Sequence, residues 1–341
     1  MSRLEADSRT VTHHQVKIDT LFRTQKLQDS DRQNCICPIP QMEFLAQKLL
    51  ELKGHNHSYR SGDLVIGLQD IELYSKNEDG VPTHLCLLVN AVDKNGSITV
   101  VRNTRNKHRF EVSPKRLEGE GYEISSHIVI NLQGKSRTHD LFMTSIPKVA
   151  TNIISLYLNR LLFEIARTYE TDFECNTVTN IVDPSTGKDK KIYFKPVFYI
   201  DGKIDTELFD KLNKEGLSDV VLIRNEHKVI RAADMHDAII PIESTLRIKP
   251  GNKDGGITSW LKSVCNHFKS DNGGKYEIIR IKFKEEDSAN PRTVSMRTDN
   301  LKLDALEKTF IKKSLITGFR TTLKDSYDII DTEIRNKILE L

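Results

Sequence analysis

Short apolar runs separated by polar turns dominate the chain between residues 63 and 146. Each run has the length of a β-strand, and the turns between them are rich in Asn, Asp and Gly, the residues that tight turns select. An earlier apolar run, Val16–Phe22, has the same character. The pattern predicts a mainly antiparallel sheet with these further strands: Leu64–Leu73, His84–Val92, Ile98–Val101, Ile124–Leu132 and Leu141–Ile146.

Two amphipathic helices are expected to pack against this sheet. The first opens at Pro40 and repeats apolar residues at helical spacing as far as Leu50. For the second, Ser145 is the predicted N-cap and Pro147 falls in the first turn. Its buried stripe is expected to contain Val149, Ile153, Leu156, Leu161 and Ile165.

The second half of the chain alternates shorter strand and helix patterns. Strands are predicted at Ile192–Ile200, Val220–Ile223, Ala238–Ile240, Leu246–Ile248, Tyr276–Phe283 and Thr293–Met296. Helices are predicted at Asp205–Lys214, at Ile257–Phe268 and at the C-terminal end. The expected fold class is α+β: a mainly antiparallel N-terminal sheet with packed helices, followed by a smaller α/β C-terminal unit. We predict three segments, an N-terminal α+β domain (1–170), a connecting α/β segment (171–245), and a basic strand-helix-strand unit with terminal helices (246–341).

Composition supports an ordinary folded protein of more than one unit. The chain has 341 residues, of which 38% are hydrophobic and 29% charged, and its formal net charge is only +3. No apolar run is long enough to span a membrane, and the N-terminal residues are polar, so neither membrane insertion nor a signal peptide is expected. Five dispersed cysteines favour reduced thiols rather than a disulfide framework. The expected location is therefore cytoplasmic.

A basic segment between Leu246 and Lys284 contains nine basic and three acidic residues. Strand alternation there predicts Ile279, Ile281 and Phe283 on one face and cations on the other. A row of cations attracts the phosphates of a nucleic acid, although alternating Lys and Arg are also usual on an exposed strand. The candidate phosphate-binding residues of this segment are Arg247, Lys249, Lys253, Arg280, Lys282 and Lys284.

A second basic cluster falls in the predicted hairpin region of the first domain. Its candidate phosphate-binding residues are Arg102, Arg105, Lys107 and Arg109, and His108, Lys115 and Arg116 lie beside them. Asn103 and Asn106 can donate hydrogen bonds to phosphate or to bases, yet they are equally the residues that a turn selects.

Metal and catalytic sites are less well supported. Cys35, Cys37, His55 and His57 are possible zinc ligands, but zinc motifs usually place at least two residues between paired cysteines. Asp234, His236 and Asp237 could hold a metal for phosphodiester hydrolysis, although a helix start or a surface turn explains them as well. Because no catalytic motif occurs, no metal, cofactor or catalytic residue is predicted.

The order of elements resembles that of the RexA-type phage-exclusion proteins, which bind DNA. The resemblance runs through the strand and helix of Ile128–Leu162, through Met235–Pro241 into Thr245–Lys249, and through the helix and basic strand that follow. It implies sequence-tolerant DNA binding as a homodimer, in anti-phage defence, with an effector or membrane-protein partner encoded nearby.

Three hypotheses of function follow. The preferred one is a non-enzymatic, sequence-tolerant DNA-binding protein, a sensor component of anti-phage defence. The second is a metal-dependent nuclease or nucleotide-processing enzyme that uses Asp234, His236 and Asp237. The third is a protein-interaction scaffold in which a C-terminal stripe forms a dimer interface, unless that stripe packs on its own domain. The stripe consists of Tyr327, Ile330, Ile334 and Ile338.

Overall fold

The computed structural model divides the chain into two compact units. Unit 1 contains Met1–Asp201 together with Lys313–Leu341, and unit 2 is the intervening Gly202–Lys312. The division differs from the three consecutive segments expected from the sequence, because the C-terminal residues return to unit 1. The structure describes residues 4–23, 32, 35–76, 80–134, 137–147, 149–177, 187, 191–203, 205, 219–225, 243–249, 260, 263–264, 266–268, 274, 276, 278–283, 292–297 and 311–341.

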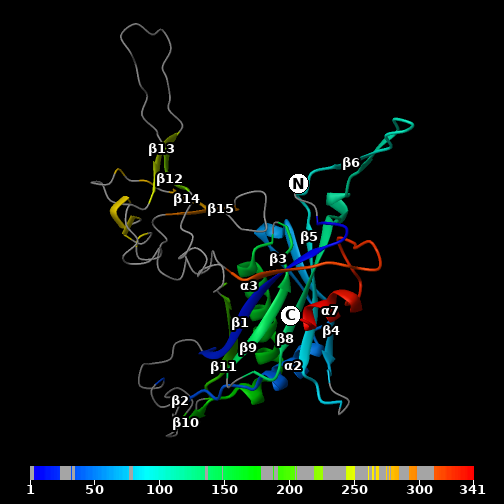
Figure 1. The fold of residues 1–341 in the computed structure, drawn as a ribbon. Helices are drawn as coiled ribbons and strands as arrows, with labels where there is room; N and C mark the ends of the chain where they lie inside the picture. Colours follow the sequence, from blue (N-terminus) through cyan, green and yellow to red (C-terminus); the bar gives the residue numbers. More distant parts are fainter. Residues whose placement is uncertain are drawn as a thin grey trace. The chain divides into compact units, whose positions relative to one another are not determined.

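A large sheet organises unit 1 (Figure 1). Its strands follow the order β11-β1-β9-β8-β5-β4-β3, and β16 pairs with β1. The pairs from β1 through β3 are antiparallel, which confirms the predicted antiparallel sheet and the α+β class. The strands are β1 (Arg9–Phe22), β3 (Asn56–Tyr59), β4 (Leu64–Tyr74), β5 (His84–Asp93), β8 (Tyr122–Asn131), β9 (Thr138–Thr144), β11 (Phe194–Gly202) and β16 (Lys313–Ile316).

Two helices, α2 (Met42–Leu50) and α3 (Thr151–Thr168), bury their apolar stripes against one face of this sheet. The second helix begins later than predicted, since its N-cap is Ala150 and not Ser145. The reason is that the backbone N–H of Ser145 donates to the carbonyl of Thr10, 2.8 Å away, which extends the β9–β1 pairing by one residue. Leu156 is exposed, whereas Leu161 and Ile165 are buried as expected.

The C-terminal segment covers the opposite face of the sheet. Ile330, together with Ile334 and Ile338 of α7 (Thr332–Leu339), packs against apolar side chains of β1, β5 and β8. The predicted stripe therefore packs on its own unit. Of the two roles considered for this stripe, packing on its own domain is observed, and the stripe is not available as a dimer interface. Tyr327 and Ile330 precede the helix, because Asp331 caps its N-terminus by accepting the backbone N–H groups of Glu333 and Ile334.

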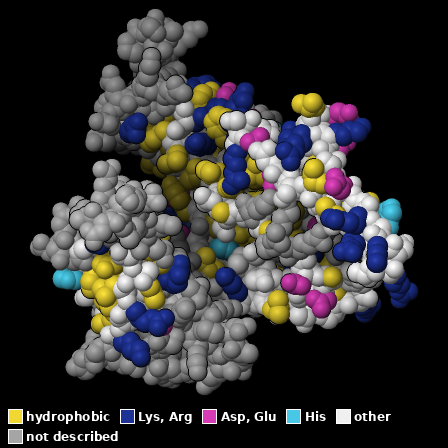
Figure 2. Space-filling model, turned by 90° about the horizontal axis from the view of Figure 1, so that it is seen from above, with side chains coloured by type: hydrophobic (Ala, Val, Ile, Leu, Met, Phe, Trp, Pro, Cys, Tyr) yellow, Lys and Arg dark blue, Asp and Glu magenta, His cyan; other side chains and the backbone are white. Residues whose placement is uncertain are grey.

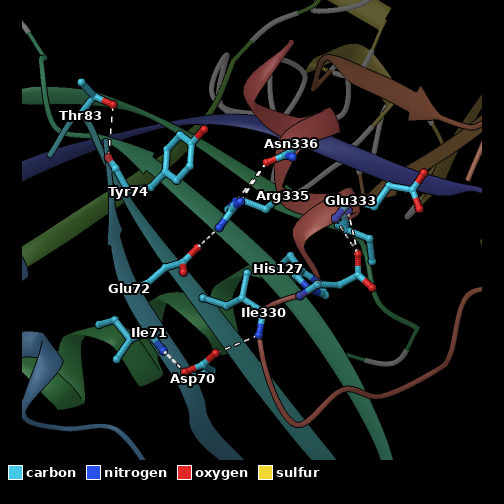
Figure 3. A network of polar contacts seen from close by, with 12 residues as sticks. Asp70, Ile71, Glu72, Tyr74, Thr83, His127, Ile330, Glu333, Arg335 and Asn336 are labelled. Carbon is cyan, nitrogen blue, oxygen red and sulfur yellow. Dashed lines mark hydrogen bonds and ion pairs between the residues drawn. The ribbon is translucent and has the colours of Figure 1, made fainter. Parts of the chain in front are cut away.

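Polar contacts fix this segment to the sheet (Figure 3). The backbone N–H of Asp331 donates to His127 Nε2 at 3.0 Å, and that of Ile330 donates to Asp70 Oδ2 at 2.9 Å. Arg335 donates to Glu72 Oε1 at 2.6 Å, and its guanidinium lies over the Tyr74 ring. The segment is thus held by directional bonds as well as by apolar burial.

Unit 2 has a four-stranded antiparallel sheet in the order β13-β12-β14-β15. One face buries Val220, Leu222, Ile279 and Ile281. The strands are β12 (Asp219–Asn225), β13 (Glu243–Ile248), β14 (Ile278–Phe283) and β15 (Arg292–Arg297). Trp260 and the described residues between 263 and 268 are helical, as predicted. The predicted strand Ala238–Ile240, and residues 206–214 of a predicted helix, lie outside the described residues.

Candidate nucleic-acid interface

A two-stranded ribbon projects from unit 1 apart from the main sheet (Figure 1). It consists of β6 (Thr99–Arg102) and β7 (Arg109–Val112), and we call Thr99–Val112 the arm. β6 corresponds to the predicted strand Ile98–Val101, but it pairs only with β7. The arm therefore has no sheet neighbour on either edge among the described residues.

The two faces of the arm differ in chemistry. On one face Val101 lies opposite Phe110, and Thr99 lies opposite Val112. On the other face Arg102 lies opposite Arg109, and Val100 lies opposite Glu111, which is the one acidic residue of the arm. Four large hydrophobic side chains of the arm, Val100, Val101, Phe110 and Val112, are 39–51% exposed. Exposed apolar side chains gathered beside charged ones make the arm a candidate contact surface for another molecule.

All four predicted cations of the arm, Arg102, Arg105, Lys107 and Arg109, are exposed. None of them forms an ion pair with another residue that the structure describes. Arg102 and Arg109 are direct cross-strand partners, an arrangement of like charges that destabilises a ribbon. Seen from above, Lys and Arg side chains are mixed with exposed hydrophobic ones on this face of the molecule (Figure 2).

The tip of the arm is an ordered turn. Asn103 Oδ1 accepts the backbone N–H groups of Arg105 and Asn106, at 2.9 and 3.3 Å. Asn106 Oδ1 accepts the N–H of His108 at 3.0 Å, and Lys107 has a positive φ of 61°. Asn103 and Asn106 were considered both as turn residues and as donors to a nucleic acid. Their side-chain oxygens stabilise the turn. The turn in consequence holds Arg105 and Lys107 in place.

Tyr122, at the start of β8, clamps the root of the arm. Its hydroxyl accepts the N–H of Thr99 at 3.1 Å and donates to the carbonyl of Val112 at 2.5 Å. A Cβ at Gly96 would lie 2.4 Å from the Tyr122 ring, so glycine is needed for this close approach. No sequence pattern singles out Tyr122, since only the folded chain brings the two strand ends to its hydroxyl.

The two other cations of the predicted cluster have structural contacts at the root. Arg116 donates to the carbonyl of Gly96 at 2.7 Å. Lys115 forms an ion pair with Glu118 at 3.2 Å. The cluster thus divides into four cations on the arm and two that are already engaged by the chain itself.

The basic face of unit 2 is partly neutralised. Ile279 and Ile281 are buried while Arg280 is exposed, so the alternation predicted for this strand is confirmed at these positions. Arg247 and Arg280 are both register partners of Val221, and Lys282 is the partner of Asp219. Arg247 forms an ion pair with Asp219 at 3.0 Å. Lys249 is exposed, whereas Lys253 and Lys284 lie outside the described residues.

The residues weighed as metal ligands do not come together in the described part of the chain. Cys37 lies against Cys175, and the His57 ring packs edge-on to Tyr59. No group of three or more His, Cys, Asp or Glu residues with the geometry to hold a metal occurs among the described residues. Asp234, His236 and Asp237 lie outside them.

Comparisons with known proteins add no relative. No family model matches the chain, and neither the curated proteins nor the solved structures give a significant match. Within the described residues, no helix has both the length and the apolar character needed to cross a membrane.

Proposed function

We propose that this chain is a non-enzymatic, sequence-tolerant DNA-binding protein whose arm contacts the phosphates of a duplex. The observation that carries the proposal is the set of four exposed cations without ion-pair partners among the described residues, two of which, Arg102 and Arg109, face each other across the ribbon. An anion bound beside that pair would relieve the repulsion between them. Counterions released from the phosphates would supply the affinity.

The shape of the arm suits a groove of DNA. A two-stranded ribbon fits the major groove, and apolar side chains such as Phe110 can contact sugars and base edges. Sequence tolerance follows from the contacts available. The Asn103 and Asn106 oxygens are used by the turn, and the proposal places the cations on phosphates rather than on base edges; phosphate contacts carry no sequence information.

A binding titration tests the proposal. Fluorescence anisotropy would measure the affinity for two duplexes of unrelated sequence over a range of salt concentrations. We expect similar affinities for both duplexes and a steep fall with salt, with a log–log slope of about 0.9 for each phosphate neutralised. Arg102→Glu with Arg109→Glu should lower this slope by about two and weaken binding by about tenfold or more.

The matched control reverses two exposed cations on other strands of unit 1, Lys17→Glu with Lys313→Glu. This pair produces the same change in net charge, so it should leave the slope almost unchanged. Equal weakening by the two double variants would show that net charge, and not the arm, governs binding. Absence of binding at low salt would overturn the proposal itself.

The basic face of unit 2 is a separate candidate surface. Replacing Arg280, Lys282 and Lys284 with Glu should abolish or strongly weaken DNA binding without unfolding the protein, if that face contacts phosphates. Retention of full binding at low salt by this triple variant would restrict the interface to unit 1. The homodimer, the effector partner and the defence role implied by the resemblance stay predictions.

A further inference from the structure

Two cysteines far apart in the sequence meet beside a short strand pair. The Sγ atoms of Cys37 and Cys175 are 2.9 Å apart. Strand β2 (Cys35–Ile36) pairs with β10 (Asn176–Thr177), with Ile36 opposite Asn176 (Figure 1). The next position along this antiparallel register brings Cys37 opposite Cys175. A disulfide bond is about 2.05 Å long, so closing the bond requires a movement of roughly 1 Å.

The two thiols have different access to solvent. Cys175 is 6% exposed and belongs to the core beneath the helices, whereas Cys37 is half-buried and packs against that core. Burial raises the pKa of both thiols, and the contact between them raises that of Cys175 further. Both therefore remain protonated near neutral pH, and reaction at this pair should accelerate as pH rises.

We propose that Cys37 and Cys175 form a thiol–disulfide modification site that reacts with a small-molecule disulfide of the glutathione type. Cys37, the more accessible thiol, loses its proton to solvent and attacks one sulfur of that disulfide. The disulfide bond breaks, and one small thiolate leaves and takes up a proton. Cys175 then loses its proton and attacks the Cys37 sulfur, which releases the second small thiol.

The electrons balance in this exchange. Two protein thiols are oxidised to one disulfide while one small-molecule disulfide is reduced to two thiols. The new bond would join residues 138 positions apart, linking the segment before α2 to the segment after η3 (Glu170–Phe173). A cross-link over so long a loop restricts the unfolded chain strongly, so the oxidised form should resist unfolding.

Neighbouring cysteines provide controls. Cys35 lies opposite Thr177 in the register, and Cys86 is buried in the other core, among the residues that α7 covers. Neither Cys35 nor Cys86 takes part in the Sγ–Sγ contact that joins Cys37 and Cys175. Cys35→Ser and Cys86→Ala should therefore leave the reaction intact, whereas Cys37→Ser should abolish the cross-link.

The test uses the full chain, reduced and then incubated with oxidised glutathione at pH 8. Mass spectrometry of tryptic peptides should show a Cys37–Cys175 linked pair, and the midpoint of thermal unfolding should rise by about 5 °C or more and return on reduction. In Cys175→Ser, Cys37 should retain a glutathione adduct, because no second thiol displaces it. A cross-link that survives Cys37→Ser, or wild-type protein in which both thiols stay free or keep adducts, would overturn the proposal.

Discussion

At the scale of single residues, protonation of His127, a residue of β8, would disrupt a hydrogen bond that holds the C-terminal segment on the sheet. Its ring is buried, and its Nε2 must be unprotonated to accept the N–H of Asp331. Desolvation lowers the pKa of His127 to about 4, with Asp331 acting in the opposite direction and Arg9 in the same one. Burial also lowers the pKa of His14 to about 4. Both rings are therefore neutral in the folded protein at neutral pH.

The pKa values predict acid sensitivity. An unfolded histidine has a pKa near 6.5, so between pH 6.5 and 4 the unfolded chain binds more protons than the folded one. The contribution of these two neutral histidines to the free energy of unfolding is then fully present above pH 6.5 and is lost as the pH falls towards 4. Each histidine should account for a loss of roughly 2 to 3 kcal/mol in the free energy of unfolding between pH 7 and 4.5. Urea unfolding at a series of pH values measures the loss.

A substitution isolates the contribution of His127. Gln at this position offers an oxygen acceptor to the Asp331 N–H but does not titrate. The number of protons taken up on unfolding, which sets the slope of the free energy of unfolding against pH, should therefore fall by about one between pH 6.5 and 4. His108→Gln, at an exposed position of the arm, is the matched histidine-to-glutamine control. An unaltered slope in His127→Gln would contradict the assignment.

Tyr122 is the residue on which the geometry of the arm depends. Tyr122→Phe keeps the ring that packs on Gly96 but removes the hydroxyl that bonds both Thr99 and Val112. We expect faster amide hydrogen exchange in β6 and β7, unchanged protection of β5, and a loss of about 1 kcal/mol from the root of the arm. Exchange followed by mass spectrometry would decide, and equal protection of the arm in both proteins would refute this role.

At the scale of elements, periodicity predicted most of the large sheet. The runs that became β4, β5 and β8 each bury apolar residues and have clear turns at their ends, so local sequence defines them. Strand β16 was missed, because four residues carry little periodic signal and its pairing with β1 joins distant parts of the chain. The prediction for the C-terminal end contained helices alone, whereas β16 and a loop precede α7 there.

The arm shows a different limit of sequence patterns. Its basic cluster was visible in the sequence, and so was a strand at Ile98–Val101. Alternation normally implies that one face is buried, yet Val101 and Phe110 remain exposed because no described element packs on them. Which cations of the cluster are engaged depends on the bond from Arg116 to the Gly96 carbonyl and on the ion pair of Lys115 with Glu118, contacts that only the folded chain makes.

The contribution of α7 to stability can be measured at one position. Ile334 is 1% exposed against the sheet, so Ile334→Ala should lower the free energy of unfolding by about 2 to 5 kcal/mol through lost burial and the cavity left behind. The matched control is Ile329→Ala, since Ile329 lies nearby in sequence but is 67% exposed and should change stability by less than about 0.5 kcal/mol. Chemical denaturation compares the two, and equal losses would mean that α7 does not pack as described.

At the scale of the whole molecule, unit 2 is an insertion between β11 and β16 of unit 1. The residues at which the chain enters and leaves unit 2 are bonded to each other, with the N–H of Lys312 donating to the carbonyl of Lys203 at 2.8 Å. Gly202 also lies against Ile311, since a Cβ on that glycine would lie 2.3 Å from the Ile311 side chain. A short connection can therefore replace everything between them.

Unit 1 should accordingly fold without unit 2. Replacing residues 204–311 with about four Gly and Ser residues should preserve one cooperative thermal transition and the contribution of the arm to the salt dependence of DNA binding. Ending the chain at Lys312 instead removes β16 and α7 and exposes the apolar residues that they cover, Val11, Cys86, Leu88 and Val129, so this variant should unfold or aggregate. Calorimetry and light scattering distinguish the two variants. If the linked variant also fails to fold, unit 1 depends on unit 2 for stability; if it folds but loses DNA binding, phosphate contacts by unit 2 are essential and the arm alone is insufficient.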